Sequence, residues 1–218
     1  MKKGDQKGVF TDKKSAEQFN RLACTVFAPV NTAVAHQIVQ ECGVNRGTAV
    51  DIGGGPGHLA IELARITDLT IISLDISACI RQVAAENIRA AGLSDRITAV
   101  TGDAAQMPLP DASVDLAVSK GSVFFWPEPA AAFREIRRVL RPGGVAWIGG
   151  GFGSSVILQG VGEQMDRFDP TWIDGVRERL GDRTAERFRE ELKKAGIEEY
   201  TLLHDPWQLW IRFQGGKG

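Results

Sequence analysis

In the stretch Val50–Ala64, VDIGGGPGHLAIELA, small and turn-forming residues join an apolar run to a helical pattern. The residues TAVDI at 48–52 predict a buried strand, and Leu59, Leu63 and Ile66 recur at the spacing of one helix face. A glycine run between strand and helix lets the backbone approach a ligand closely at the carboxyl edge of a parallel sheet. The stretch therefore predicts an α/β domain with a ligand site at this loop.

Strand and helix patterns alternate after this loop. Further strands are predicted at 70–76, 97–103, 113–119 and 145–151, with helices at 77–91 and 130–140 and a turn at 141–144, RPGG. Helical crossovers of this length between buried strands favour parallel, right-handed connections. The series therefore predicts five parallel strands.

The C-terminal third changes character. Residues 152–182 predict one or two helices with loops around Pro170 and Gly175, and residues 184–195 predict an amphipathic helix that buries Phe188 and Leu192. The apolar runs at 199–204 and 207–213 are separated by two residues, which is too short for a parallel crossover. We therefore expect these two strands to pair antiparallel.

Two helical patterns between Thr11 and Cys42 precede the first strand. Their apolar stripe must be buried, and the later strands and helices complete a sheet without them. We expect these helices to cover the ligand crevice and to turn Phe19 and Phe27 towards Phe124–Trp126; the alternative is that they pack on the outer face of the sheet for stability alone. The expected organisation is one domain, with a helical cover at 1–43, a cofactor-binding core at 44–151 and a C-terminal part at 152–218.

Composition limits the partners. The 26 basic and 27 acidic residues give a net charge of -1, so no overall positive field favours nucleic acid or an anionic membrane. No 18 apolar residues run together, and the three cysteines fit neither a disulfide framework nor a metal cluster. We expect a cytoplasmic protein without a metal.

Two common uses of a glycine loop are disfavoured by neighbouring residues. A dinucleotide fingerprint needs glycine where His58 stands, and Pro56 lacks the N–H that a pyrophosphate would use. No Gly-Lys-Ser/Thr follows, as a P-loop requires. A nicotinamide-dependent oxidoreductase is therefore disfavoured.

The order Asp51-x-Gly53-x-Gly55-x-Gly57 resembles the first motif of the class I S-adenosylmethionine-dependent methyltransferases. Asp75 stands 22 residues after the first glycine, Asp103 ends the third predicted strand, and LRPGG at 140–144 is also similar to the family. The resemblance covers about 49–151. It implies a Rossmann-like, doubly wound, mostly parallel seven-stranded sheet with an antiparallel C-terminal strand, and S-adenosyl-L-methionine as the cofactor.

The resemblance also implies a set of site residues. Asp75 would accept the ribose hydroxyls, Asp103 would face the adenine amine, and Ser119–Gly121 would line the methionyl end. The implied cofactor-binding residues are Asp51, Gly53, Gly54, Gly55, Gly57, Asp75, Ile76, Gly102, Asp103, Ala104, Ser119, Lys120 and Gly121; Phe19, Phe27, Phe124, Phe125 and Trp126 are the expected acceptor-binding residues. The Asn/Asp-Pro-Pro-aromatic motif of nucleic-acid amine methyltransferases is absent at 119–126.

Some residues have a simpler structural interpretation. Lysines are mostly exposed, so we favour a solvated Lys120 over one that holds an anionic substrate. For His58 we favour a position at a helix start over a catalytic base. Of three consecutive aromatic residues at 124–126, not all can face one side, so at least one is expected at the acceptor pocket. The arginines at 134, 137, 138 and 141 are interpreted as a solvated helix face.

These observations favour a methyltransferase that acts on a small molecule by in-line displacement, in which holding the reactants in line provides much of the acceleration. No residue stands out as a general base, so no catalytic side chain is assigned. The alternative is a protein of the same fold that binds S-adenosylmethionine as a sensor or partner subunit, without methyl transfer.

Overall fold

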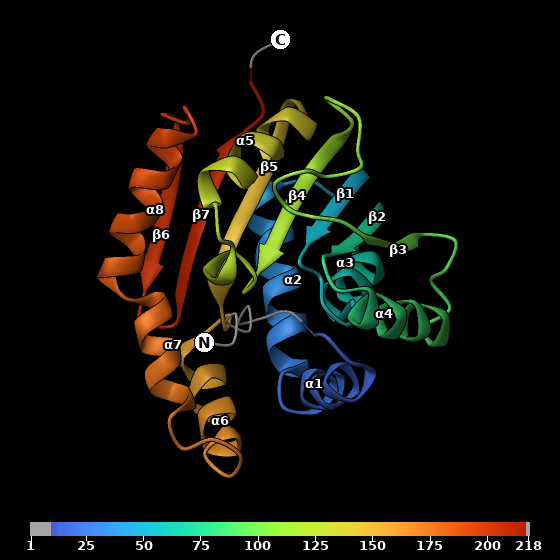
Figure 1. Ribbon diagram of the computed structural model, residues 1–218, viewed down its shortest axis with the longest axis vertical. Helices are drawn as coiled ribbons and strands as arrows, with labels where there is room; N and C mark the ends of the chain where they lie inside the picture. Colours follow the sequence, from blue (N-terminus) through green and yellow to red (C-terminus); the bar gives the residue numbers. More distant parts are fainter. Residues whose placement is uncertain (1–9, 217–218) are drawn as a thin grey trace, which may run out of the picture.

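The computed structural model describes residues 10–216, which build a seven-stranded sheet in the order β3-β2-β1-β4-β5-β7-β6 (Figure 1). The first five strands are parallel, and β7 pairs antiparallel with both β5 and β6. The predicted mixed sheet is therefore confirmed. The strands are β1 Arg46–Ile52, β2 Asp68–Asp75, β3 Ile97–Thr101, β4 Val114–Lys120, β5 Leu140–Gly151, β6 Tyr200–Asp205 and β7 Gln208–Gln214.

Helices cover both faces of the sheet (Figure 1). Buried side chains of α2, α3 and α4 form one core cluster with the sheet, and those of α5, α7 and α8 form the other. Neighbouring strand residues alternate between the clusters: Ala49 belongs to the first and Val50 to the second. The helices are α1 Lys13–Thr25, α2 Ala28–Cys42, α3 His58–Ile66, α4 Ala78–Ala90, α5 Pro129–Val139, α6 Ser155–Met165, α7 Trp172–Leu180 and α8 Asp182–Lys194, with a short 3-10 turn, η1, at Val123–Phe125.

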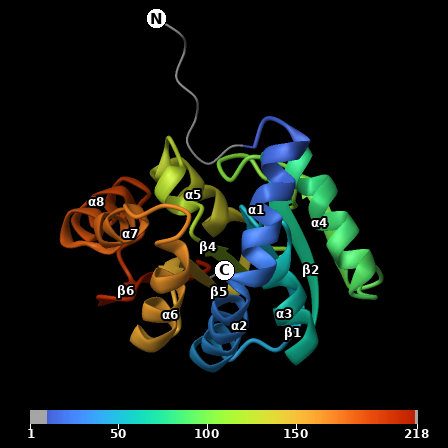
Figure 2. The same cartoon turned by 90° about the horizontal axis from the view of Figure 1, so that it is seen from below.

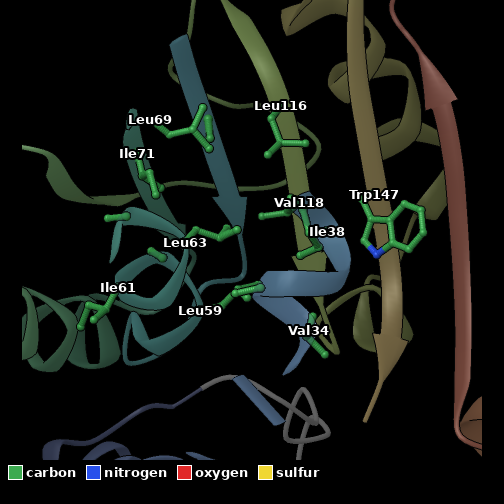
Figure 3. Close-up of a cluster of buried hydrophobic side chains, with 14 of the residues drawn as sticks. Val34, Ile38, Leu59, Ile61, Leu63, Leu69, Ile71, Leu116, Val118 and Trp147 are labelled. Carbon is green, nitrogen blue, oxygen red and sulfur yellow. The ribbon is translucent and has the colours of Figure 1, made fainter. Parts of the chain in front are cut away.

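The first core cluster joins the N-terminal part of the chain to the sheet. Figure 3 shows Val34 and Ile38 of α2 beside Val118 of β4 and Trp147 of β5. The side chains of Val34, Ile38, Val118 and Trp147 are fully buried. Helix α2 therefore packs on a face of the sheet, which is the alternative position considered for the N-terminal helices.

Helix α1 has a different position. The axes of α1 and α2 differ in direction by 71°. Helix α1 lies beyond the strand ends, and α6 and α7 lie across those ends from it (Figure 2). Asp12 caps α1 by accepting a hydrogen bond from the Ser15 N–H at 2.9 Å, and Gly43 ends α2 in the left-handed conformation. The two predicted N-terminal helices are thus present, and α1 is the one near the carboxyl edge.

Three local predictions are corrected. Gly175 was expected in a loop but lies inside α7, where burial of Val176 and Leu180 holds the helix together. The RPGG segment was expected as a turn before β5 but lies within it, at a register shift against β4 between Val114 and Leu116. Asp103 was expected at the end of β3 but follows the last strand residue, Thr101, by two positions.

Candidate functional site

The glycine loop between β1 and α3 is fastened to the end of β2. The N–H groups of Gly53 and Gly54 both donate to the carbonyl oxygen of Leu74, at 2.7 and 3.0 Å. The Gly55 N–H donates to Oδ2 of Asp75 at 3.0 Å. These donors are used within the protein, whereas a bound pyrophosphate would require them to point at the ligand. The loop therefore favours a ligand that has no phosphate at this position.

Three glycines of the loop lie so close to neighbouring side chains that a Cβ would meet them. A Cβ on Gly53 would lie 2.3 Å from Oγ of Ser122, and one on Gly54 would lie 2.6 Å from Oγ of Ser73. Gly57 has a φ of 83° and faces Ala84 of α4, with a Cβ distance of 3.4 Å. Gly57 does not line the cavity described below, so its position is explained by backbone conformation and helix packing. The expectation that Gly57 faces the cofactor has no geometric support.

Asp51 is the buried carboxylate of the site. Its side chain is 1% exposed, and Oδ2 has no hydrogen-bond partner among the described residues. Burial raises the pKa of Asp51 to about 7; the Lys120 ammonium opposes the rise, and the neighbouring Asp75 adds to it. A buried oxygen without a partner is costly, so a cationic or hydrogen-bonding ligand group at Oδ2 would relieve it.

Lys120, the last residue of β4, lines the same cavity as Asp51. Its side chain is part-buried, and burial lowers the pKa of its ammonium while Asp51 opposes the change. The interpretation of Lys120 as a solvated lysine is therefore wrong. The Lys120 side chain lines the cavity together with Asp51, and its position at the end of β4 places it there.

Asp75 ends β2 and holds two segments in place. Its Oδ1 accepts from the Ser77 N–H at 2.9 Å and its Oδ2 from the Gly55 N–H at 3.0 Å. Burial raises the pKa of Asp75, and these two hydrogen bonds oppose the rise. A carboxylate has about four acceptor positions, so Asp75 retains capacity for two ligand hydroxyls.

The segment after β3 lines the cavity beyond Asp75. Asp103 is exposed and accepts a hydrogen bond from the Ala105 N–H at 2.8 Å. Ile76 is 50% exposed, which is unusual for so large an apolar side chain at a strand end. Gly102 and Ala104 stand on either side of Asp103 and line the same space. This end of the cavity thus offers an apolar surface beside a carboxylate.

One cavity of about 940 Å³ collects these residues at the carboxyl edge of the sheet. All of the predicted site residues line it except Gly57 and Ser119. Ser119 is fully buried, and its hydroxyl lies 2.7 Å from that of Ser122, which donates to the carbonyl oxygen of Ile52 at 2.9 Å. Ser119 therefore supports the wall from behind.

Aromatic side chains form the rest of the cavity wall. Phe124 lies against Phe188 and Trp126 against Phe133, at ring distances of 5.8 and 6.2 Å, while Phe125 is 45% exposed. The three therefore diverge as expected, yet all of them line the cavity. A Cβ on Gly150 would lie 2.6 Å from the Phe124 ring, so the glycines that end β5 give this ring its place.

The opposite wall comes from segments that are distant in the sequence. Phe19 of α1 and Phe27 before α2 line the cavity as expected. The ring of Phe27 lies 5.9 Å from that of Trp172 on α7, and Trp172 lies 5.7 Å from Phe152. Sequence patterns missed several lining residues, because only the tertiary fold brings them here: Phe10, Asn31, Glu128, Phe152, Trp172, Val176, Arg179 and Leu180.

Other candidates have structural partners. His58 begins α3 as expected, and burial lowers the pKa of its ring. The arginines of α5 and its end were interpreted as solvated, but Arg138 pairs with Glu135 and Asp111, and Arg141 with Asp115. Within residues 10–216 no cluster of three metal-ligating side chains exists, and no single helix is long and apolar enough to cross a membrane.

Comparisons with known proteins show the family to which the chain belongs. A family model described as a methyltransferase domain matches residues 50–148. A crystal structure from Methanococcus maripaludis, described as a candidate S-adenosyl-L-methionine-dependent methyltransferase, is 38% identical, with a TM-score of 0.92 over 100% of this chain and 98% of that one. The chain belongs to the class I S-adenosylmethionine-dependent methyltransferases.

Two named relatives of this family are similar over most of the chain. A sterol 24-C-methyltransferase of Gibberella zeae is 33% identical over 78% of this chain. A 2-methyl-6-phytyl-1,4-hydroquinone methyltransferase of Oryza sativa is 30% identical over 76%. The chain spans less than half of the length of these relatives, 43% and 44% respectively.

The cofactor of the family, S-adenosylmethionine, fits the residues present. It carries an amino group, a sulfonium, a ribose and an adenine but no phosphate, and the loop offers no free row of N–H donors. The partnerless oxygen of Asp51, the spare acceptor positions of Asp75 and the ammonium of Lys120 match an amino group, hydroxyls and a carboxylate. The chemistry of the lining therefore agrees with the family.

Proposed function

We propose that this chain transfers a methyl group from S-adenosylmethionine to a small-molecule acceptor by in-line displacement. The observation that carries the proposal is that the carboxylates at three strand ends and the aromatic side chains of α1, η1 and α7 line one and the same cavity. Donor and acceptor would therefore share one enclosed space at the carboxyl edge of the sheet, where α/β domains bind ligands.

The proposed cofactor positions follow the strand ends. Asp75 would accept the ribose hydroxyls, Asp103 the adenine amine with Ile76 against the ring, and Asp51 and Lys120 would hold the charged methionyl end. Ile76 supports this order, since it lines the cavity and half of its apolar surface is left uncovered by the fold. When bound, S-adenosylmethionine supplies an electrophilic methyl group.

The chain's own contribution to the reaction would be positioning and exclusion of water. The aromatic wall limits how an acceptor can lie, and holding reacting groups in line accounts for much of the acceleration of such a step. The only imidazole that lines the cavity, among the described residues, is His58, and it is engaged with Asn20 at 2.8 Å. We therefore assign no general base.

A small apolar acceptor is supported by two features. The acceptor half is lined by Phe19, Phe27, Phe124, Phe125 and Trp126, which offer ring faces and few hydrogen-bonding groups. The relatives named for a sterol and a phytyl hydroquinone act on molecules of that character. We further propose that α1, within the predicted cover at 1–43, closes the cavity of the core at 44–151, in one domain and in the cytoplasm. Helix α2 of the same segment packs on the sheet, and residues 1–9 lie outside the described part of the chain.

Turnover of labelled cofactor tests the proposed function. The full-length protein is incubated with methyl-labelled S-adenosylmethionine and fractions of a cellular small-molecule extract, and both labelled product and S-adenosylhomocysteine are measured. Label should move into at least one fraction with wild type and with Asp95→Ala, an exposed carboxylate outside the cavity, but not with Asp75→Ala. Bound cofactor with no transfer in any fraction would instead favour a binding protein of the same fold.

A further inference from the structure

One face of α7 lines the acceptor half of the cavity. Trp172, Val176 and Arg179 follow one another at i, i+4 and i+7, which places them on the same side of the helix, and all three line the cavity. Figure 2 shows α7 across the strand ends from α1. Two residues of this helix face, Trp172 and Val176, are apolar, and the third, Arg179, carries a positive charge.

Arg179 has no anionic partner in the part of the chain that the structure describes. No carboxylate lies within 4 Å of its guanidinium, whereas Arg177, two residues earlier, pairs with Asp174 at 3.0 Å on the exposed side of α7. The Arg179 side chain is part-buried, and burial lowers its pKa, while the charge of neighbouring Glu178 opposes this change without forming an ion pair. An arginine stays protonated in proteins, so its charge is retained at a cost that a partner would offset.

Gly175 makes room for this guanidinium. A Cβ at residue 175 would lie 3.2 Å from Nη1 and 3.8 Å from Nη2 of Arg179, so the fork lies over the helix backbone one turn back. Glycine inside a helix costs about 0.5–1 kcal/mol relative to alanine. The absence of a side chain at residue 175 therefore leaves the space in which the Arg179 fork lies.

The surroundings of Arg179 decide what it could bind. The other side chains that α7 contributes to the lining are Trp172, Val176 and Leu180, all of them apolar. Glu128 also lines the cavity but makes no ion pair with Arg179. The remaining lining carboxylates, at residues 51, 75 and 103, stand at the strand ends and are assigned above to the cofactor. Lys120, the other cation of the lining, is likewise assigned to the cofactor, which leaves Arg179 as a single planar fork for the acceptor. Such a fork matches one carboxylate, which it can hold by two parallel hydrogen bonds.

We propose that Arg179 binds a carboxylate of the methyl acceptor, so that the acceptor is an apolar or aromatic monocarboxylate. The inference rests on the proposed function, because it places this acceptor in the cavity beside the cofactor. The carboxylate would pair with the guanidinium, and the apolar part would lie along Trp172 and Val176. Arg179 then selects the substrate and fixes its orientation, while methyl transfer occurs elsewhere on the molecule.

Paired ligands that differ only in charge test the proposal. Phenylacetate, 3-phenylpropanoate and 4-phenylbutanoate are each compared with the corresponding primary amide, by calorimetry on full-length protein saturated with S-adenosylhomocysteine. At least one carboxylate should bind about tenfold more tightly than its amide. Arg179→Gln should abolish that difference and Arg179→Lys should retain part of it, because lysine keeps the charge but not the fork.

Controls separate the possible failures. Arg177→Gln lies in the same last turn of α7 but outside the cavity, so it should keep the wild-type preference. The melting temperature of each variant checks folding. Absence of any carboxylate preference in wild type, or an unchanged preference in Arg179→Gln, would overturn the inference. Failure of wild type to bind S-adenosylhomocysteine at all would instead count against the proposed function.

Discussion

The side-chain oxygen of Asn20 on α1 lies 2.8 Å from Nε2 of His58 at the start of α3. The same oxygen accepts a hydrogen bond from Nδ2 of Asn87 on α4 at 2.9 Å, and that amide also donates to the carbonyl oxygen of Pro56 at 2.8 Å. This polar cluster ties α1 to the glycine loop and to two core helices. Because burial lowers the pKa of His58, the neutral ring donates to Asn20 near neutral pH.

Breaking this cluster should loosen α1 over the site. Asn20→Leu removes the shared acceptor, so the dissociation rate of S-adenosylhomocysteine should rise several-fold while the core stays folded. Stopped-flow fluorescence measures the rate, and Gln18→Ala, an exposed neighbour on the same helix, is the control. Equal dissociation rates in Asn20→Leu and wild type would contradict a covering role for α1.

Asp75 should contribute strongly to cofactor affinity. Asp75→Ala removes the charged acceptor that we assign to the ribose, so S-adenosylhomocysteine should bind about 1.5–3 kcal/mol more weakly. The variant should also be less stable, because the N–H groups of Gly55 and Ser77 lose their acceptor. Calorimetry measures affinity, with Asp95→Ala as the control. Asp103→Ala should have a smaller effect, since Asp103 is exposed. A folded Asp75→Ala of wild-type affinity would refute the ribose assignment.

The raised pKa of Asp51 should make stability depend on pH. Between the unfolded value near 4 and the folded value of about 7, the folded protein holds a proton that the unfolded chain releases. The free energy of unfolding should therefore fall as pH rises through this range, by at most about 1.4 kcal/mol per unit. Asp51→Asn lacks this group, so its stability relative to wild type should increase from pH 5 to pH 8.

Urea unfolding at both pH values measures this difference. Asp103→Asn is the matched control, because it makes the same substitution at an exposed carboxyl. Parallel profiles for Asp51→Asn and wild type would show that Asp51 does not carry the proton.

Substitution by alanine should have different effects at two glycines of the same loop. Gly57→Ala meets a φ of 83° and the side chain of Ala84, so stability should fall by about 1–2 kcal/mol while S-adenosylhomocysteine affinity is retained. Gly54→Ala would place its Cβ 2.6 Å from Ser73 and 2.9 Å from Oδ2 of Asp51, which should displace that carboxylate and weaken binding. Thermal unfolding and calorimetry on both variants separate the roles; equal loss of affinity in the two would show that Gly57 serves the ligand after all.

Local patterns in the sequence predicted most of the fold because they report local physics. Leu59 and Leu63, predicted at helical spacing, are buried in α3, and local residues set other helix bounds, with Ser77 capping α4 and Gly43 ending α2. The same logic failed at Gly175, since glycine propensity is weak compared with the burial of its neighbours on α7.

The carboxylates at the strand ends and the aromatic residues at 19, 27 and 124–126 were predictable parts of the candidate site. Asp51 and Asp75 lie at the ends of two neighbouring strands whose register the sheet fixes, so their meeting was foreseeable. Trp172 and Arg179 reach the same cavity through the packing of α7, which no short pattern encodes. Gly57 was predicted to face the cofactor but packs against α4 instead. A glycine in this motif can be required for close approach of a ligand or for helix packing, and the sequence does not distinguish the two.

Calorimetric titration of the full-length protein with S-adenosylhomocysteine, and separately with NAD⁺, decides which class of cofactor the cavity binds. The phosphate-free site predicts one molecule of S-adenosylhomocysteine bound per chain in the micromolar range, about -8 kcal/mol, and no saturable heat with NAD⁺. Saturable binding of NAD⁺ with no heat from S-adenosylhomocysteine would contradict it.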